Sequence, residues 1–73
     1  SEKENIILQI YLQNYLFNDF EELTNIELSA IIGDLTQQTI NKYTQELEKK
    51  GYLVKIKQRP LTYALSEKIT EKM

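Results

Sequence analysis

The sequence predicts a single mainly α-helical domain with a small β-hairpin, an α+β fold in the order α-α-α-β-β-α over residues 1–73. A chain of 73 residues with 41% hydrophobic and 27% charged residues suits one small folded domain. Before Gly51 the apolar residues recur with the helical period, and after it the period changes to two.

The first helix is expected over residues 1–18, and Asn18-Asp19 ends it. Its apolar residues cover well over half of the circumference, more than a two-layer domain of this size buries. The inward stripe is expected to hold Ile7, Leu8, Tyr11, Leu12, Tyr15 and Leu16. Outside it lie Ile6, Ile10 and Phe17. The helix therefore presents a candidate partner surface, to which we assign Ile6, Ile10, Tyr11, Tyr15 and Phe17; packing within the chain is the alternative for both tyrosines.

Residues 20–24 are expected to form a short link into a second helix. Thr24 or Asn25 caps this helix, and Glu27 lies three residues after Thr24, the spacing of a capping box. Its inward face is expected to hold Ile26 or Leu28, Ile31 and Ile32. Gly33 ends the helix, because glycine adopts positive φ without strain.

A tight corner over residues 34–36 leads to a third helix over residues 36–50. Its buried stripe is expected to hold Ile40, Tyr43, Thr44 and Leu47, and Gly51 is its C-cap. The two helices and their corner form a helix-turn-helix over residues 24–51.

Residues 52–65 are expected to form a hairpin. Lys55 and Lys57 lie on one face of its first strand, and Val54 and Ile56 lie on the other. The turn follows over residues 58–61, and residues 62–65 return as the second strand. A further helix starts within residues 66–73.

This order, with the helix-turn-helix followed by a hairpin, resembles a winged helix-turn-helix of the bacterial multiple-antibiotic-resistance repressor type. The resemblance covers about residues 23–69 and rests on Thr24, Gly33, the run Thr36-x-x-Thr39-Ile40, and Leu47-Glu48-Lys49-Lys50-Gly51-Tyr52-Leu53. The closing Tyr63-Ala64-Leu65-Ser66-Glu67-Lys68 resembles the family's second wing strand. One departure is Thr44, where the pattern usually has Ile or Leu.

The resemblance implies sequence-specific binding of double-stranded DNA by the module of a transcriptional regulator, with the third helix in the major groove and wing residues 55–60 on phosphates. Amide side chains pair with adenine, and the third helix has no arginine placed for guanine, so an adenine-rich site is expected. The expected DNA-contacting residues are Thr36, Gln37, Gln38, Thr39, Asn41, Lys42, Gln45, Lys55, Lys57 and Arg59. The ordinary alternative is that these residues form a solvated polar face.

Charge is distributed unevenly along the chain. Residues 1–33 carry one base and six acids, a net charge of −5, whereas residues 34–73 carry eight bases and five acids, a net charge of +3. Window 41–59 is the most basic, with six bases and two acids. This asymmetry favours a local basic face. Lys49 and Lys50 also suit the negative end of a helix dipole for purely structural reasons.

The partner expected at the first helix is a second copy of the chain, since a dimer doubles its contacts on a palindromic site. A neighbouring domain of a longer protein is the alternative. The other candidate function is a winged helix for protein interaction, or an accessory domain of a DNA replication protein (an initiator or a helicase) with weak or single-strand DNA binding.

Composition argues against several other classes of protein. The chain has no cysteine and no histidine, so we expect no enzyme, no metal site and no cofactor. No apolar run approaches the length that spans a bilayer and no signal segment is evident, so no membrane partner and a cytoplasmic location are expected. Abundant Ile and Lys with scarce Arg and Val are compatible with an AT-rich bacterial, phage or plasmid genome.

Overall fold

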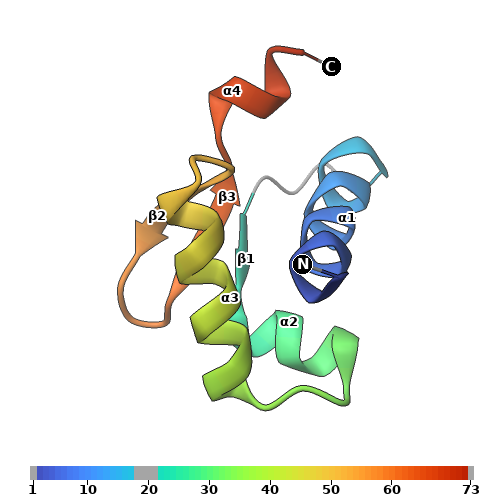
Figure 1. Cartoon of the computed structure of the whole chain (residues 1–73), viewed down its shortest axis with the longest axis vertical. Helices are drawn as coiled ribbons and strands as arrows, with labels where there is room; N and C mark the ends of the chain where they lie inside the picture. The colour runs from blue at the N-terminus through green and yellow to red at the C-terminus, as the bar shows by residue number, and fades with distance from the viewer. Residues whose placement is uncertain (1, 18–21, 73) are drawn as a thin grey trace.

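The computed structural model describes residues 2–17 and 22–72. These residues form a small α+β domain that consists of four helices and a three-stranded antiparallel sheet (Figure 1). The elements in chain order are α1 (Glu2–Phe17), β1 (Glu22–Thr24), α2 (Asn25–Ile32), α3 (Gln37–Lys49), β2 (Leu53–Lys57), β3 (Thr62–Leu65) and α4 (Glu67–Thr70). The expected mainly helical fold with a small hairpin is therefore confirmed at this level.

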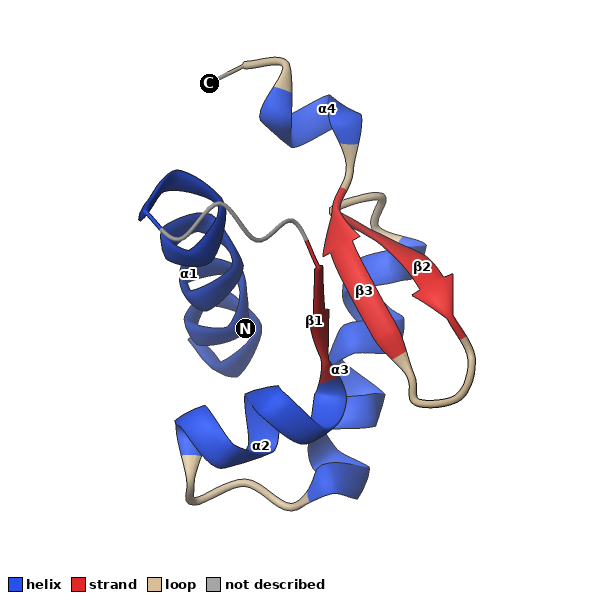
Figure 2. Ribbon diagram, turned by 180° about the vertical axis from the view of Figure 1, so that it is seen from behind, coloured by secondary structure: helices blue, strands red, loops and turns tan. Residues whose placement is uncertain are grey.

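The sheet has the strand order β1-β3-β2, so β3 is its central strand (Figure 2). β1 pairs with β3 from Glu22↔Ala64 to Thr24↔Thr62, and β2 pairs with β3 from Leu53↔Leu65 onward. The predicted link over residues 20–24 was therefore wrong for residues 22–24, which form a strand. A three-residue strand is too short to show a period, and its partner lies far away in the sequence.

The start of α2 follows the sequence prediction closely. Thr24 is the N-cap: its hydroxyl accepts from the Glu27 backbone N–H at 3.0 Å, and its own N–H donates to the Glu27 carboxylate at 2.9 Å. Gly33 ends the helix with φ of +83°. Of the alternatives Ile26 and Leu28 on the expected inward face, Leu28 is the buried one, and Ile32 packs against the core. Ile31 was wrongly placed inside, because it is 57% exposed.

α3 is amphipathic in the way the sequence predicts. Ile40, Thr44 and Leu47 are buried, and Tyr43 is partly buried against the core. The helix ends at Lys49, and Gly51 follows with φ of +85°, which permits the chain to turn into β2.

The core lies between α1, α2, α3 and one face of the sheet. Its buried cluster consists of Ile7, Tyr11, Leu23, Leu28, Ile40, Leu47, Leu53, Tyr63 and Leu65. Tyr11 is 2% exposed, and its hydroxyl donates to the Leu23 carbonyl at 3.2 Å, which ties α1 to the edge strand β1. Burial raises the pKa of the Tyr11 phenol, as expected of a hydroxyl that stays neutral inside the protein.

Candidate nucleic-acid interface

The side of α3 that faces away from the core is polar. Gln37, Gln38, Lys42 and Gln45 are exposed, and Thr39 and Asn41 are half-buried. This arrangement follows from the helical period, because the buried Ile40, Thr44 and Leu47 occupy the opposite stripe. The amide groups that the sequence analysis assigned to a DNA contact thus lie along one helix face.

The N-terminus of α3 is capped by its own residues. The Thr36 hydroxyl accepts from the Thr39 backbone N–H at 3.2 Å and is hydrogen-bonded to the Thr39 hydroxyl at 2.9 Å. Thr36 and Thr39 therefore hold the first turn in shape. The backbone N–H groups of Gln37 and Gln38 lie in the first turn, where a helix supplies no carbonyl acceptor for them. They are therefore suited to an anion such as a phosphate.

The hairpin places its basic residues in solvent. Lys55, Lys57 and Arg59 are all exposed, and the Lys55 ammonium donates to the Gln58 side chain at 3.2 Å. The register shifts between Lys55 and Lys57, which bends β2 near the turn. The hairpin tip thus carries three cations on a short, irregular edge.

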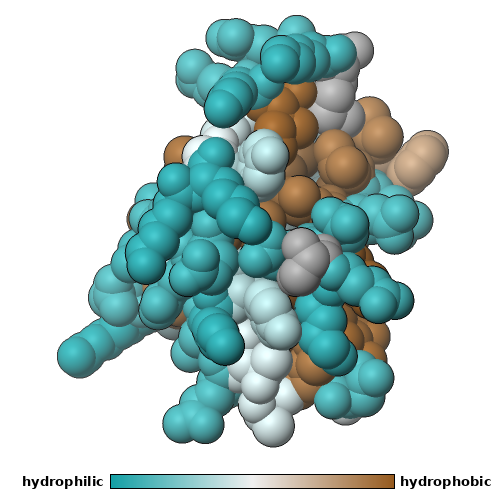
Figure 3. Space-filling model, in the orientation of Figure 1, coloured by the Kyte–Doolittle hydropathy of each residue, from teal (hydrophilic) through white to brown (hydrophobic). Residues whose placement is uncertain are grey.

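α3 and the hairpin are neighbours in space. α3 packs against β2, and the two lie side by side in both ribbon views (Figures 1 and 2). Figure 3 shows mainly hydrophilic side chains over these elements, whereas hydrophobic side chains gather on the side of α1. We call the exposed side of α3 together with hairpin residues 55–59 the α3–hairpin face.

Two of the lysines at the end of α3 have acidic partners. Lys49 lies 3.9 Å from Glu46, and Lys50 donates to the Glu4 carboxylate of α1 at 2.6 Å. The hydrogen bond with Lys50 lowers the pKa of Glu4, and the same bond raises the pKa of Lys50. Lys50 therefore links α1 to α3, and Lys42, Lys55, Lys57 and Arg59 remain as the principal cations of the α3–hairpin face.

A buried polar network behind α3 was not anticipated from the sequence. Asn25, at the first position of α2, is 1% exposed, and its Nδ2 donates to Asn41 Oδ1 at 2.7 Å and to Thr44 Oγ1 at 3.1 Å. The sequence analysis placed Thr44 on the buried stripe and noted its departure from an apolar pattern, and here its side chain is a hydrogen-bonding partner of Asn25. Its unusual polarity at a core position was the one available signal.

The surface assigned to α1 needs correction. Tyr11 was wrongly included, because it is buried in the core of its own chain. Ile10 and Tyr15 are partly buried and pack against that core, whereas Ile6 and Phe17 are 43% and 78% exposed. Leu16 was wrongly placed inside and is 55% exposed. The apolar residues that α1 offers to solvent are therefore Ile6, Leu16 and Phe17.

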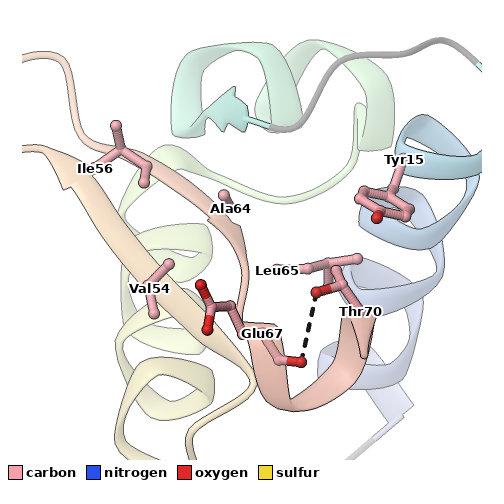
Figure 4. Close-up of a pocket in the computed structure, with 7 residues that line it drawn as sticks. All are labelled: Tyr15, Val54, Ile56, Ala64, Leu65, Glu67 and Thr70. Carbon is pink, nitrogen blue, oxygen red and sulfur yellow. Dashed lines mark hydrogen bonds between the residues drawn. The ribbon is translucent and has the colours of Figure 1, made fainter. Parts of the chain in front are cut away.

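A hollow opens on the side of the sheet near α4, with a volume of about 580 Å³. Figure 4 shows its walls, which come from the C-terminal part of α1, the hairpin and α4. The lining residues are Tyr15, Val54, Ile56, Ala64, Leu65, Glu67 and Thr70. Val54 and Ile56, which the alternation placed on the face opposite the lysines, are 43% and 46% exposed here.

Within residues 2–17 and 22–72, no cluster of acidic side chains is arranged to hold a metal ion. Every helix of the described chain is too short or too polar to cross a membrane. Comparison of the chain with protein-family models, with curated proteins and with solved structures found no match.

Proposed function

We propose that this domain is a winged helix-turn-helix module that binds double-stranded DNA sequence-specifically in a transcriptional regulator. In this proposal α3 enters the major groove and hairpin residues 55–60 act as the wing on phosphates. The observation that carries the proposal is the α3–hairpin face, where an amide-rich helix side adjoins a basic hairpin.

The components of this face suit the separate tasks of DNA recognition. The carboxamides of Gln38 and Gln45 carry a donor and an acceptor each, the pairing that adenine offers in the major groove. The cations at Lys55, Lys57 and Arg59 suit phosphates, which hold a protein in register without sequence information. An adenine-rich site remains the expected preference.

A duplex-binding titration tests the proposal. The probes are a random duplex and an AT-rich duplex, each at several salt concentrations. We expect affinity to fall with salt, because each neutralised phosphate releases condensed counterions. The triple variant Lys55→Ala/Lys57→Ala/Arg59→Ala should bind about tenfold more weakly or worse, with a salt slope smaller by up to about 2.7.

A matched triple variant separates a local effect from net charge. Lys3, Lys68 and Lys72 are exposed and lie outside the α3–hairpin face, so Lys3→Ala/Lys68→Ala/Lys72→Ala removes the same charge elsewhere. We expect this variant to keep most of the affinity. Equal losses in the two variants, or no duplex binding at low salt, would contradict the proposal.

A second candidate function is protein contact, and the exposed apolar residues favour it. Two groups of large apolar side chains are exposed to solvent rather than buried in the core: Ile6, Leu16 and Phe17 on α1, and Val54 and Ile56 beside the sheet hollow. A second copy of this chain is the partner expected at α1. Sedimentation of the chain and of Leu16→Ser/Phe17→Ser, at concentrations spanning micromolar values, decides whether α1 mediates self-association.

A further inference from the structure

Asn25 occupies an unusual position between the elements of the α3–hairpin face. Its backbone N–H donates to the carbonyl of Leu61, the last residue of the hairpin turn before β3, at 2.9 Å. Its side-chain Nδ2 donates to Asn41 and Thr44 of α3. A single buried residue is thus bonded both to the hairpin and to the helix beside it.

The hydrogen bonds of Thr44 determine which way the Asn25 amide points. The Thr44 hydroxyl has one proton, and it lies 3.0 Å from the Ile40 carbonyl and 3.1 Å from the Asn41 carbonyl, both of which only accept. With its proton used there, the Thr44 oxygen accepts from Asn25 at 3.1 Å. The Asn25 atom at this position is therefore the NH₂ group.

The same NH₂ group determines the orientation of Asn41. An atom of Asn41 lies 2.7 Å from Asn25 Nδ2 and must be an acceptor, so it is Oδ1. Among the described residues, Asn25 Oδ1 is buried and has no hydrogen-bond partner. An orphaned buried acceptor costs free energy. Both hydrogen bonds of the Asn25 NH₂ group are thus made to α3, while the Asn25 side-chain oxygen has no partner among the described residues.

We propose that Asn25 is a positioning residue that turns the Asn41 carboxamide so that α3 presents a hydrogen-bond donor, Nδ2, rather than a donor–acceptor pair. Recognition of adenine by one amide requires Oδ1 and Nδ2 to face the same base edge. Asn41 Oδ1 is held towards the protein, so Asn41 contacts an acceptor of the DNA through Nδ2 alone. The paired adenine contacts then belong to Gln38 and Gln45. The DNA part of this inference rests on the proposed function, whereas the orientation of the amides does not.

The orientation is tested first in the free protein by NMR with ¹⁵N-labelled side chains. We expect the Asn25 Nδ2 protons to exchange with solvent at least about tenfold more slowly than those of Asn41, since two hydrogen bonds protect them. We also expect nuclear Overhauser contacts from the Asn25 NH₂ protons to Thr44. Fast exchange at Asn25, or protected Asn41 NH₂ protons in contact with Asn25, would overturn the proposal whether or not DNA binds.

A double-mutant cycle on the dissociation constant then tests the DNA part. Asn25→Asp replaces the inward donors by acceptors, which turns the Asn41 amide over and presents Oδ1 instead. We expect it to weaken binding to a duplex selected by the wild-type chain by about fivefold or more, the effect of one specific contact. In an Asn41→Ala background the same change should have little further effect.

Thr24→Ala is the matched control, since it removes the side-chain cap of α2 next to Asn25 and leaves the side chains of Asn25, Asn41 and Thr44 in place. It should lower thermal stability while keeping the base preference at each position of the selected site. If Asn25→Asp unfolds the chain, Asn25→Ala in the same cycle replaces it. Additive effects of the Asn25 and Asn41 substitutions would overturn the DNA part. Absence of any duplex binding by the wild-type chain would refute the proposed function and with it the DNA part, while the NMR result still decides the positioning.

Discussion

α1 and α3 differ in how much of their apolar surface they bury. α3 has one buried stripe, at Ile40, Thr44 and Leu47, and a polar opposite side. α1 buries Ile7 and Tyr11 yet also leaves large apolar side chains in solvent. The outer side of α3 is therefore polar and well solvated, whereas the outer side of α1 leaves apolar side chains exposed, which is why we propose a partner there.

The largest effect expected from this comparison concerns two adjacent residues of α1. Ile7→Ala should lower the free energy of unfolding by about 2–5 kcal/mol, because the side chain is fully buried and leaves a cavity. Ile6→Ala should cost about 1 kcal/mol or less, since Ile6 is 43% exposed. Urea denaturation measures both. Equal costs would mean that a partner buries Ile6 in solution. The exposure of Ile6 in the single chain would then not describe the protein in solution.

The next effect concerns the outer side of α3. Gln38→Ala or Gln45→Ala should reduce discrimination for adenine at one position of a selected site by about 1–3 kcal/mol. Both residues are exposed, so the free energy of unfolding should change by only about 0.5 kcal/mol. Gln13→Ala on the exposed side of α1 is the matched control. Competition titrations with single-base variants measure the preference, and an unchanged preference in both variants would contradict the role given to α3.

The two helix caps sharpen the comparison further. Thr24→Ala and Thr36→Ala should each destabilise the domain by about 0.5–2 kcal/mol, because each removes a side-chain acceptor from an N–H of the first turn. Only Thr36→Ala should also weaken duplex binding, since it loosens the N-terminus of α3. Thermal unfolding combined with a duplex titration separates the two. Weaker duplex binding in Thr24→Ala, with unchanged binding in Thr36→Ala, would mean that the N-terminus of α2 rather than that of α3 contacts DNA.

The smallest effect concerns the ion pair that joins α1 to α3. The pKa of Glu4 is lowered from 4.5 in the folded state by its hydrogen bond with Lys50. The stabilisation is therefore present above the unfolded pKa and is lost as the pH falls through the lower folded pKa. We expect the wild-type chain to lose more stability below pH 4.5 than Glu4→Gln does. If the free energy of unfolding of both proteins fell equally with pH, the Glu4–Lys50 pair would not contribute to the pH dependence of stability.

Sequence patterns predicted α3 and β3 closely. The helix expected over residues 36–50 is observed as Gln37–Lys49, and the strand expected over residues 62–65 is observed as Thr62–Leu65. In α3 the apolar residues fall on a single stripe, so only one orientation buries them. The capping box at Thr24 and Glu27 was likewise predictable, because both partners are local in sequence.

The remaining features depend on contacts between distant residues. α1 is apolar on several sides, so the sequence alone does not decide that Tyr11 is inside and Leu16 outside. β1 exists because β3 pairs with it, and its three residues show no pattern of their own. At the candidate interface the polar residues of α3 were predictable from the period, but the hydrogen bond from Asn25 to Asn41 joins residues sixteen positions apart.

The most direct test of the central proposal is to record backbone ¹H–¹⁵N spectra of the chain during addition of an AT-rich duplex. We expect the largest shift changes at residues 36–45 and 55–59, with residues 6–17 of α1 nearly unchanged. That result would locate duplex binding on the α3–hairpin face. Shift changes concentrated on α1 or around the sheet hollow, or no change at low salt, would contradict the proposal.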